Sequence, residues 1–228
     1  MGGDAILRTL LNYQGAAPAG RLTTTAYRQE FTARPMSDMS LKNITYKHYT
    51  GEVCYPFGYG LSYSQFDVQW ANGTTASLTV STDEMRASHS EYFVARARGD
   101  HTWTSPASYS ATIKNVGKIA SDYVLLGFVS SPARMATDPD EPLQELFDFA
   151  RVSLAPGAST TVHLSLPASV LSHVDVHGNE RVMAGSYKIE LGAERLGDRS
   201  ALQSTLTVTG APQTLFSMSE VRAKYQYE

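Results

Sequence analysis

Residues 55–66, YPFGYGLSYSQF, separate two parts of the chain that have different sequence patterns. The glycines and the proline of this segment break any helical pattern, and so many turn-forming residues are unlike an ordinary strand. Three roles fit such a segment: a ligand cradle, a stacking platform for a ligand, or a joint between two units of structure. The residues of this segment alone leave all three roles open.

Downstream of this segment, short stretches with alternating apolar and polar residues recur, and turn residues separate them. The stretches are residues 66–70, 77–80, 109–116, 122–129, 151–154, 160–166, 187–191 and 205–208. Turn signals at this spacing, without a helical pattern between them, are typical of an antiparallel β-sandwich. Residues 81–106 have no clear period, and we expect an insertion loop there. We place the sandwich domain at residues 67–212 and a polar tail, with a frayed helical end, at residues 213–228.

Upstream of the segment, the chain has one helical pattern and one short strand pattern. Apolar residues at positions 6, 7, 10 and 11 recur at helical spacing, Asp4 lies near the expected N-cap, and Gly15 follows the expected end. Residues 22–25 are expected to form a short strand after a turn. A single helix and a single strand cannot build the core of a sheet, so residues 1–66 look like the edge of a larger α/β unit.

Composition excludes several classes of function. The chain has 228 residues and a formal charge of -3, with 22 acidic and 19 basic residues mixed along it, so no basic stripe predicts nucleic-acid binding. No apolar run is long enough for a membrane span, and the first residues lack a signal-peptide pattern. The single cysteine, Cys54, excludes an intrachain disulfide. Asn43 and Asn72 begin two possible N-glycosylation motifs, which are compatible with secretion.

Two short motifs resemble catalytic or cofactor-binding signatures only in part. Residues 58–63, GYGLSY, begin like a dinucleotide fingerprint, but Tyr63 occupies the position of the third glycine and no strand–turn–helix pattern surrounds it. Residues 60–64, GLSYS, lack the last glycine of a nucleophile elbow. We therefore predict no nucleotide cofactor and no nucleophilic serine.

Two other clusters contain possible metal ligands. His173, Asp175 and His177 would share one face of an extended segment, as three zinc ligands do, but a polar hairpin arm beside a turn is the favoured interpretation. Residues 138–142, DPDEP, contain three carboxylates that suit calcium, and here a stiff solvated loop is favoured. We assign no metal site.

Three further side chains have a structural and a functional interpretation. Cys54 lies among aromatic residues without a cationic neighbour, so we expect a structural thiol rather than a nucleophile. Trp70 and Trp103 have the chemistry to stack on sugar rings, but tryptophans near strands more often pack in a core or at an edge. The residues alone identify no catalytic group and leave the substrate-binding residues unknown.

The joint segment resembles a segment of one enzyme family. Residues 56–66, PFGYGLSYSQF, are similar to the Phe-Gly-x-Gly-Leu-Ser-Tyr-x-x-Phe junction of glycoside hydrolase family 3. Residues 2–11 and 18–22 look like the last helix and following strand of that family's α/β sandwich domain. Residues 35–39 and 45–51 are similar to its β-xylosidase branch, which usually has arginine in place of Lys47 and an aromatic residue in place of His48.

The resemblance continues downstream of the joint. Residues 142–152 and 154–157 resemble a core strand and turn of the family's fibronectin type III-like domain, with Asp148 where a glycine is usual. Residues 170–172 and 185–192 complete the pattern. The resemblance thus implies a mostly β chain, in which an immunoglobulin- or fibronectin type III-like sandwich follows a short α/β remnant.

The resemblance also implies a function and a role for the joint. Family members are secreted enzymes that cleave β-glycosidic bonds with retention, using two carboxylates from domains that precede the matched region. By this resemblance the chain is a C-terminal fragment of a β-xylosidase- or β-glucosidase-like enzyme of xylan breakdown. It is expected to dock on the absent catalytic domains, to need no cofactor and to be inactive alone. The aromatic joint residues are expected to fill the domain interface: Tyr55, Phe57, Tyr63 and Phe66. Gly58 and Gly60 are expected to permit a tight crossing of the backbone.

Two other functions remain open on the sequence alone. A stand-alone carbohydrate-binding or protein-interaction module would use exposed aromatic residues on the sandwich and bind xylan oligomers. A nonfunctional truncated product would expose Ile6, Leu7, Leu10 and Leu22 and would aggregate or need a partner chain.

Overall fold

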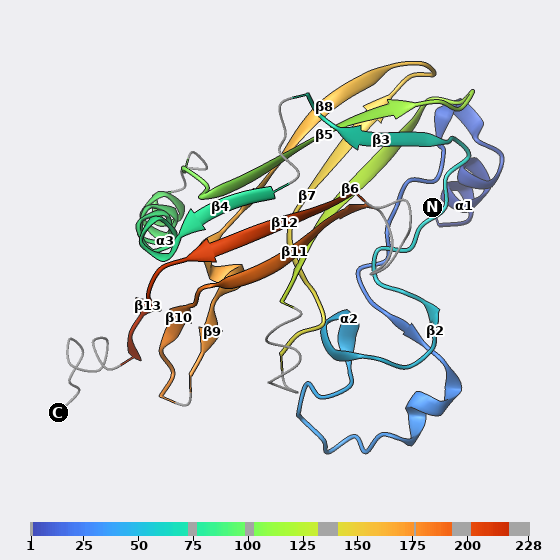
Figure 1. Cartoon of the computed structure of the whole chain (residues 1–228). Helices are drawn as coiled ribbons and strands as arrows, with labels where there is room; N and C mark the ends of the chain where they lie inside the picture. Colours follow the sequence, from blue (N-terminus) through green and yellow to red (C-terminus); the bar gives the residue numbers. More distant parts are fainter. Residues whose placement is uncertain are drawn as a thin grey trace.

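The computed structural model describes residues 2–72, 77–98, 103–131, 141–175, 177–192 and 202–218. A β-sandwich forms the larger part of the molecule, and a segment made mostly of loops extends from one of its edges (Figure 1). We call residues 21–59 the arm. The arm is closed at its base by two hydrogen bonds, from Leu22 N to Tyr59 O and from Gly58 N to Leu22 O, both 2.8 Å long.

Two main sheets make up the sandwich. The larger sheet contains, in spatial order, β4 (Ser77–Ser81), β12 (Leu202–Thr209), β11 (Gly185–Gly192), β6 (Ser121–Ser130) and β7 (Glu145–Leu154). The smaller sheet contains β3 (Phe66–Trp70), β5 (Ala107–Asn115) and β8 (Ser159–Leu166). Each predicted strand of the sandwich is present. The predicted sandwich is confirmed, and β4 pairs with β12 in parallel, whereas the other ladders of these two sheets are antiparallel.

The core lies between the two sheets because alternate side chains of each strand point inward. Ile113 and Leu164 from the smaller sheet and Leu125, Ile189 and Leu206 from the larger sheet are fully buried in one cluster. Phe66 and Trp70 of β3 pack against this cluster at its edge. The sandwich therefore has a continuous apolar core that needs no contribution from the arm.

A third, small sheet extends one end of the sandwich. It contains β13 (Gln213–Phe216), β10 (Glu180–Val182) and β9 (His173–Val174) in that order, and a short 3-10 turn (Ala168–Leu171) leads into it. Residues 213–216, which the sequence pattern assigned to the tail, thus form a strand that pairs with β10. The expected frayed helix at the C-terminal end lies outside the described residues.

The insertion loop expected at residues 81–106 was a wrong prediction, because α3 (Thr82–Ala97) occupies most of this range. Ser81 and Glu84 begin the helix with a reciprocal cap. Ser81 N donates to Glu84 Oε2 over 2.7 Å, and Glu84 N donates to Ser81 Oγ over 3.2 Å. This Ser-x-x-Glu capping box satisfies two backbone groups at the helix start, which compensates for the weak apolar periodicity.

The N-terminal region contains short elements joined by loops. They are α1 (Gly2–Leu10), a 3-10 turn (Tyr13–Gly15), β1 (Ala26–Tyr27), a second 3-10 turn (Gln29–Ala33), α2 (Thr45–His48) and β2 (Val53–Tyr55). The predicted helix is present. The strand expected at residues 22–25 is not, because Leu22 forms its hydrogen bonds with the end of the arm, and the strand β1 begins four residues later and pairs with β2.

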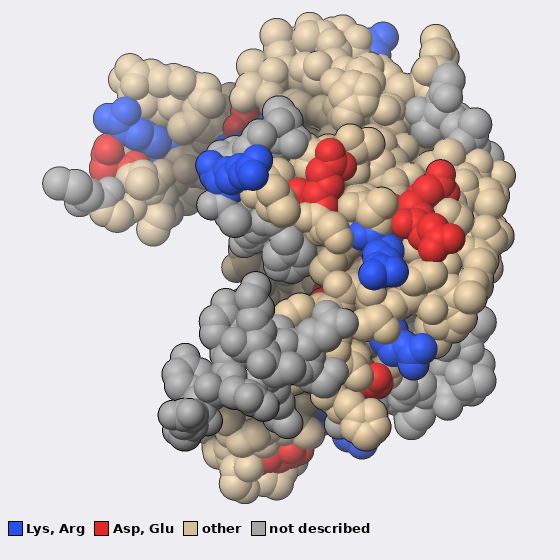
Figure 2. Space-filling model, turned by 90° about the vertical axis from the view of Figure 1, so that its left-hand side faces the viewer, with Lys and Arg blue, Asp and Glu red and all other residues tan. Residues whose placement is uncertain are grey.

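Charged side chains are interspersed on the part of the surface shown in Figure 2. Lysine and arginine lie beside aspartate and glutamate over the described residues of that face, without a large area of one sign. Within the described residues, no helix is both long and apolar enough to cross a membrane.

Candidate binding site between the arm and the sandwich

The joint glycines lie where the backbone requires them. Gly58 has a φ of 81°, in the left-handed region that favours glycine. At Gly60, an added Cβ would collide with the carbonyl oxygen of Gly20 and approach Cδ of Arg21 to 2.9 Å. The chain therefore crosses itself closely at the base of the arm.

The joint aromatic residues have different surroundings. Phe57 stacks on Tyr46 of α2 with ring centroids 4.2 Å apart, and both rings contact Phe128 of β6 edge to face. Phe66 lies 4.9 Å from the ring of Tyr123. Phe57 thus joins the arm to the larger sheet, and Phe66 belongs to the edge of the core.

Tyr55 and Tyr63 are about half exposed. Tyr63 donates a hydrogen bond from its hydroxyl to Leu10 O over 3.1 Å, which links the joint to α1. Tyr55 lies 4.8 Å from the ring of Tyr59. Their expected role in a domain interface stays a prediction.

Polar contacts fasten α2 to the segment that begins β7. Leu143 N donates to Lys47 O over 2.6 Å, and Leu146 N donates to the hydroxyl oxygen of Tyr46 over 3.2 Å. Lys47 Nζ and Glu145 Oε1 form an ion pair 2.6 Å long, with both side chains about one third exposed. These three contacts join residues that are about 100 positions apart, and they hold the arm against the larger sheet.

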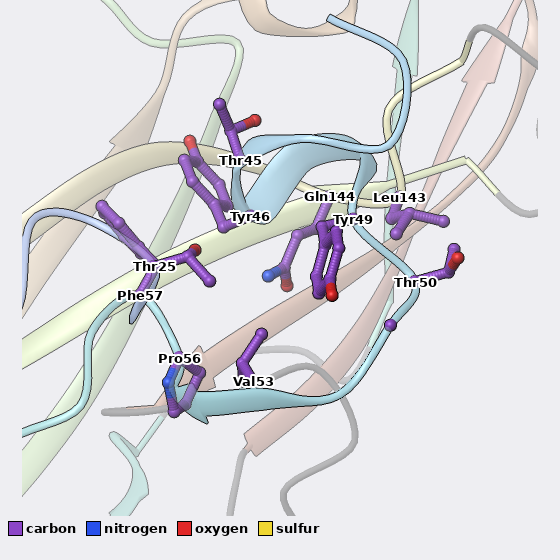
Figure 3. Close-up of a pocket in the computed structure, with 11 residues that line it drawn as sticks. Thr25, Thr45, Tyr46, Tyr49, Thr50, Val53, Pro56, Phe57, Leu143 and Gln144 are labelled. Atoms are coloured by element: carbon purple, nitrogen blue, oxygen red, sulfur yellow. The ribbon is translucent and has the colours of Figure 1, made fainter. Parts of the chain in front are cut away.

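A pocket of about 190 Å³ opens beside these contacts (Figure 3). Its walls come from the arm and from the segment before β7: Thr25, Thr45, Tyr46, Tyr49, Thr50, Gly51, Val53, Pro56, Phe57, Leu143 and Gln144. Figure 3 shows the Gln144 amide near the middle of the pocket, close to the ring of Tyr49. The side chains that line it are aromatic, aliphatic, hydroxyl or amide, and none is charged.

Two of the residues that line this pocket have a buried polar atom without a hydrogen-bond partner among the described residues. Gln144 is 8% exposed, and its Oε1 has no hydrogen-bond partner among the described residues. The same holds for Oγ1 of Thr25. A buried polar atom left in this state costs about 1–3 kcal/mol. Both atoms therefore lower the stability of the fold around the pocket.

The rim of the pocket contains an unusual backbone conformation. Thr45 has a φ of 58°, which is rare for a β-branched residue. Its N–H donates to the hydroxyl oxygen of Tyr27 over 2.6 Å, and the ring of Tyr27 stacks on Phe31 and meets Tyr49 edge to face. This aromatic cluster holds the strained residue in place, and such strain is often found at functional sites.

The histidines considered as metal ligands lie in a hairpin, which is the interpretation favoured from the sequence. Asp175 Oδ1 accepts hydrogen bonds from the backbone N–H groups of His177 and Asn179, both 2.9 Å long. The Asn179 N–H is the main cause of a lowered pKa of Asp175. Among the described residues, no three potential metal ligands form a cluster. Residues 138–140, the centre of the possible calcium site, lie outside the described part of the chain.

The remaining residues singled out from the sequence lie apart from the pocket lining. Cys54 is exposed, and its Sγ lies 3.5 Å from Tyr27 O. Trp103 contacts Tyr92 of α3 edge to face, with ring centroids 5.0 Å apart. Trp70 packs on the core, so neither tryptophan forms an open stacking platform.

Both asparagines of the possible glycosylation motifs are exposed. Asn43 Oδ1 accepts a 3.3 Å hydrogen bond from Thr50 N. Of the second motif, Asn72 is described, whereas residues 73 and 74 lie outside the described part of the chain.

Comparison with known proteins agrees with this architecture. Residues 124–195 match the model of the fibronectin type III-like domain. A probable exo-1,4-beta-xylosidase of Aspergillus japonicus is 33% identical over 206 residues, and the match covers 85% of this chain and 24% of the relative. The exo-1,4-beta-xylosidase of Emericella nidulans is 32% identical over 189 residues, covering 78% of this chain and 22% of the relative.

Two solved glycosidase structures contain the same fold. A GH3 exo-beta-xylosidase in complex with a xylobiose aziridine probe superimposes with a TM-score of 0.72 at 28% identity, over 91% of this chain and 27% of that one. The beta-D-glucoside glucohydrolase of Trichoderma reesei gives 0.63 at 25% identity, over 88% and 28%.

The fold and the aromatic joint define this chain as a fibronectin type III-like β-sandwich with an attached arm. Sequence and structure together show that it belongs with the C-terminal portion of glycoside hydrolase family 3 β-glycosidases. The chain spans about a quarter of the length of the relatives it matches.

Sequence reasoning did not find the pocket. Its lining comes from residues 25, 45–57 and 143–144, which only the folded arm brings together. Parts of the last two segments were recognised as family-like, but no pattern within either segment shows that Gln144 and Thr25 line the same pocket.

Proposed function

We propose that this chain is the C-terminal, non-catalytic part of a retaining β-glycosidase of the β-xylosidase type, which acts on β-linked oligosaccharides such as those of xylan. The names of the matched relatives support this class of substrate. In this proposal residues 1–66 complete an α/β domain and residues 67–212 are the sandwich. The nucleophile and the acid/base belong to the catalytic domains that precede it, so this chain alone is inactive.

The observation that carries this proposal is the exposed apolar face of α1. Ile6, Leu7, Leu10 and Leu11 are between 56% and 67% exposed, and the helix buries none of its residues. An amphipathic helix normally buries its apolar stripe, and an exposed stripe marks an interaction surface. Figure 1 shows α1 near β3, the edge strand of the smaller sheet, and we propose that a further domain covers its exposed apolar residues there.

We further propose that the whole enzyme is secreted. The exposed side chains of Asn43 and Asn72 support this, because both are accessible for N-glycosylation.

A chimera tests the docking role. The C-terminal quarter of the Aspergillus japonicus relative is replaced by this chain, and hydrolysis of 4-nitrophenyl β-D-xyloside is measured. We expect an active chimera, and we expect Leu7→Glu with Leu10→Glu to abolish activity because two charges enter the interface. Val94→Glu is the matched control, since Val94 is an exposed apolar residue of α3.

Two results would contradict the proposal. The first is a chimera whose activity is unchanged by the two α1 substitutions. The second is hydrolysis by the isolated chain that persists through repurification. The proposal places both catalytic carboxylates in other domains, so the isolated chain should have no activity.

A further inference from the structure

We propose that Met36 and Met39, in the middle of the arm, form an oxidation site of this chain. Hydroperoxides convert both thioethers to sulfoxides there before they oxidise the methionine of the core, and the fold is kept. The function proposed above assigns no chemistry to these residues, so this inference goes beyond it. Three features carry it: the exposure of the two side chains, a loop that does not depend on them, and the burial of the core methionine.

Both arm methionines are almost completely open to solvent. Met36 is 98% exposed and Met39 is 90% exposed, whereas no described leucine is more than 67% exposed. A side chain that is exposed to this degree packs on almost nothing, so a dissolved peroxide reaches the sulfur atom from most directions. Exposure is one of the factors that decide which sulfur in a protein is oxidised first.

The loop that carries the two methionines is held by Arg34 and by the backbone. Arg34 donates from Nη1 to Lys42 O over 2.6 Å and from Nη2 to Ser40 O over 2.7 Å, and Nη2 lies 2.9 Å from Asp38 Oδ2. Asp38 Oδ1 accepts a 2.9 Å hydrogen bond from Ser40 N. None of these contacts uses a methionine side chain, so oxidation of the sulfur atoms leaves the contacts in place.

The reaction is a two-electron transfer of oxygen. A lone pair of the thioether sulfur attacks one oxygen of hydrogen peroxide, so an S–O bond forms while the O–O bond breaks. The departing hydroxide takes the proton of the transferred oxygen and leaves as water. The sulfur is oxidised to a sulfoxide and the peroxide is reduced, and an alkyl hydroperoxide reacts in the same way to leave an alcohol. The apolar side chain becomes polar, which costs little where it already faces water.

The other described methionines are less accessible. Met85 of α3 is fully buried in the core cluster, where a sulfoxide would place a polar group among apolar side chains. Met183 and Met218 are partly buried, and Met1 and Met135 lie outside the described residues. Among the described methionines, oxidation should therefore begin on the arm and reach Met85 last.

The test is limited oxidation of the folded chain with hydrogen peroxide, followed by digestion with trypsin and mass spectrometry. The tryptic peptide 29–42 contains both arm methionines and no cysteine, because Pro35 blocks cleavage after Arg34. Fragmentation locates the oxygen on Met85, whose peptide also contains Cys54. We expect both arm methionines to be oxidised roughly tenfold faster than Met85 or more. In concentrated urea the rates should become similar, because unfolding removes the protection of the core.

Variants separate the two sulfur atoms. Met36→Leu and Met39→Leu should each remove one of the two oxygen atoms that peptide 29–42 gains, and Met85→Leu is the matched control that leaves this gain unchanged. The urea midpoint of a chain oxidised only on the arm should equal that of the unoxidised chain.

The proposal is overturned if Met85 is oxidised as fast as the arm methionines in the folded chain, or if Met183 and Met218 are oxidised before them. A lower urea midpoint after oxidation of the arm alone would also overturn it. The result is independent of the chimera test, because the isolated chain is oxidised whether or not the chimera is active.

Discussion

The sandwich and the N-terminal region differ in where their apolar side chains lie. In the sandwich, the strands β5, β6, β8, β11 and β12 direct a set of fully buried residues into one core. In residues 2–65, neither the helices nor the 3-10 turns bury any residue, and the leucines of α1 face solvent. The sandwich thus carries its own stability, whereas the N-terminal region is held by a few aromatic contacts and hydrogen bonds.

The apolar residues of the two regions therefore have different roles. The alternating apolar residues of the sandwich pack in a core within the same chain, so substitutions there should alter the stability of the whole domain. The apolar residues of α1 are exposed, so substitutions there should alter the association of this chain with the proposed further domain and not its stability. Substitutions of the same type in the two regions therefore test the comparison.

The largest difference is expected for leucine to alanine. Leu164 is fully buried in β8, so Leu164→Ala leaves a cavity and should lower the free energy of unfolding by about 2–5 kcal/mol. Leu10→Ala should change it by no more than ~0.5 kcal/mol, because Leu10 is exposed and alanine favours a helix. Urea denaturation of both variants measures this. Equal losses at the two positions would show that α1 is part of the same cooperative core.

A smaller and more local effect is expected at the base of the arm. Gly60→Ala places a methyl group against the Gly20 carbonyl and should destabilise the arm by about 1–3 kcal/mol. Hydrogen exchange at Gly58 and Leu22 should accelerate while that of the sandwich strands stays unchanged. Gly20→Ala is the control, since its added Cβ meets nothing within 4 Å. Faster exchange throughout the sandwich would contradict a separately held arm.

The smallest effect is expected for tyrosine to phenylalanine, and its sign should differ between the regions. The hydroxyl of Tyr109 is buried in the core without a partner among the described residues, so Tyr109→Phe should stabilise the protein by ~1 kcal/mol. Tyr63→Phe removes the hydrogen bond to Leu10 O and should not stabilise it. Thermal and urea unfolding of the two variants compare them. A loss of stability in Tyr109→Phe would indicate an unseen partner for that hydroxyl.

The same variant makes a pH prediction. Burial raises the pKa of the Tyr109 hydroxyl. The unfolded chain therefore loses this proton near pH 10 while the folded chain keeps it, so unfolding becomes more favourable above that pH. Measured as the difference from Tyr109→Phe, the wild type should lose stability above about pH 10 and show no such trend below it.

Much of the sandwich was predictable from the sequence because its signals are local. Alternation in residues 66–70 and 160–166 is visible within one strand, and each strand was found near its predicted position. The parallel pairing of β4 with β12 was not predictable, because it joins residues about 130 positions apart. The helix α3 was missed for another reason: its apolar periodicity is weak, and its clearest signal is the capping pair of Ser81 and Glu84.

The candidate site was predictable only in part. The sequence predicted a joint between two domains at residues 55–66, which stays a prediction, and Gly58 and Gly60 lie at points where a side chain is unfavourable. The burial of Gln144 and Thr25 depends on how the arm folds back onto β7, and hydrogen bonds such as that between Leu143 N and Lys47 O decide this. Such long-range contacts leave no periodic trace in the sequence.

The paired hydrogen bonds between Leu22 and the backbone at residues 58–59 make the arm a closed loop whose two ends are neighbours. Lengthening or shortening such a loop costs little, because closure entropy grows only slowly with length. We therefore expect that residues 23–57 can be exchanged as a unit if the hydrogen bonds of Leu22 are kept. Such an exchange would change the residues that line the pocket and leave the residues of the sandwich core and of α1 unchanged.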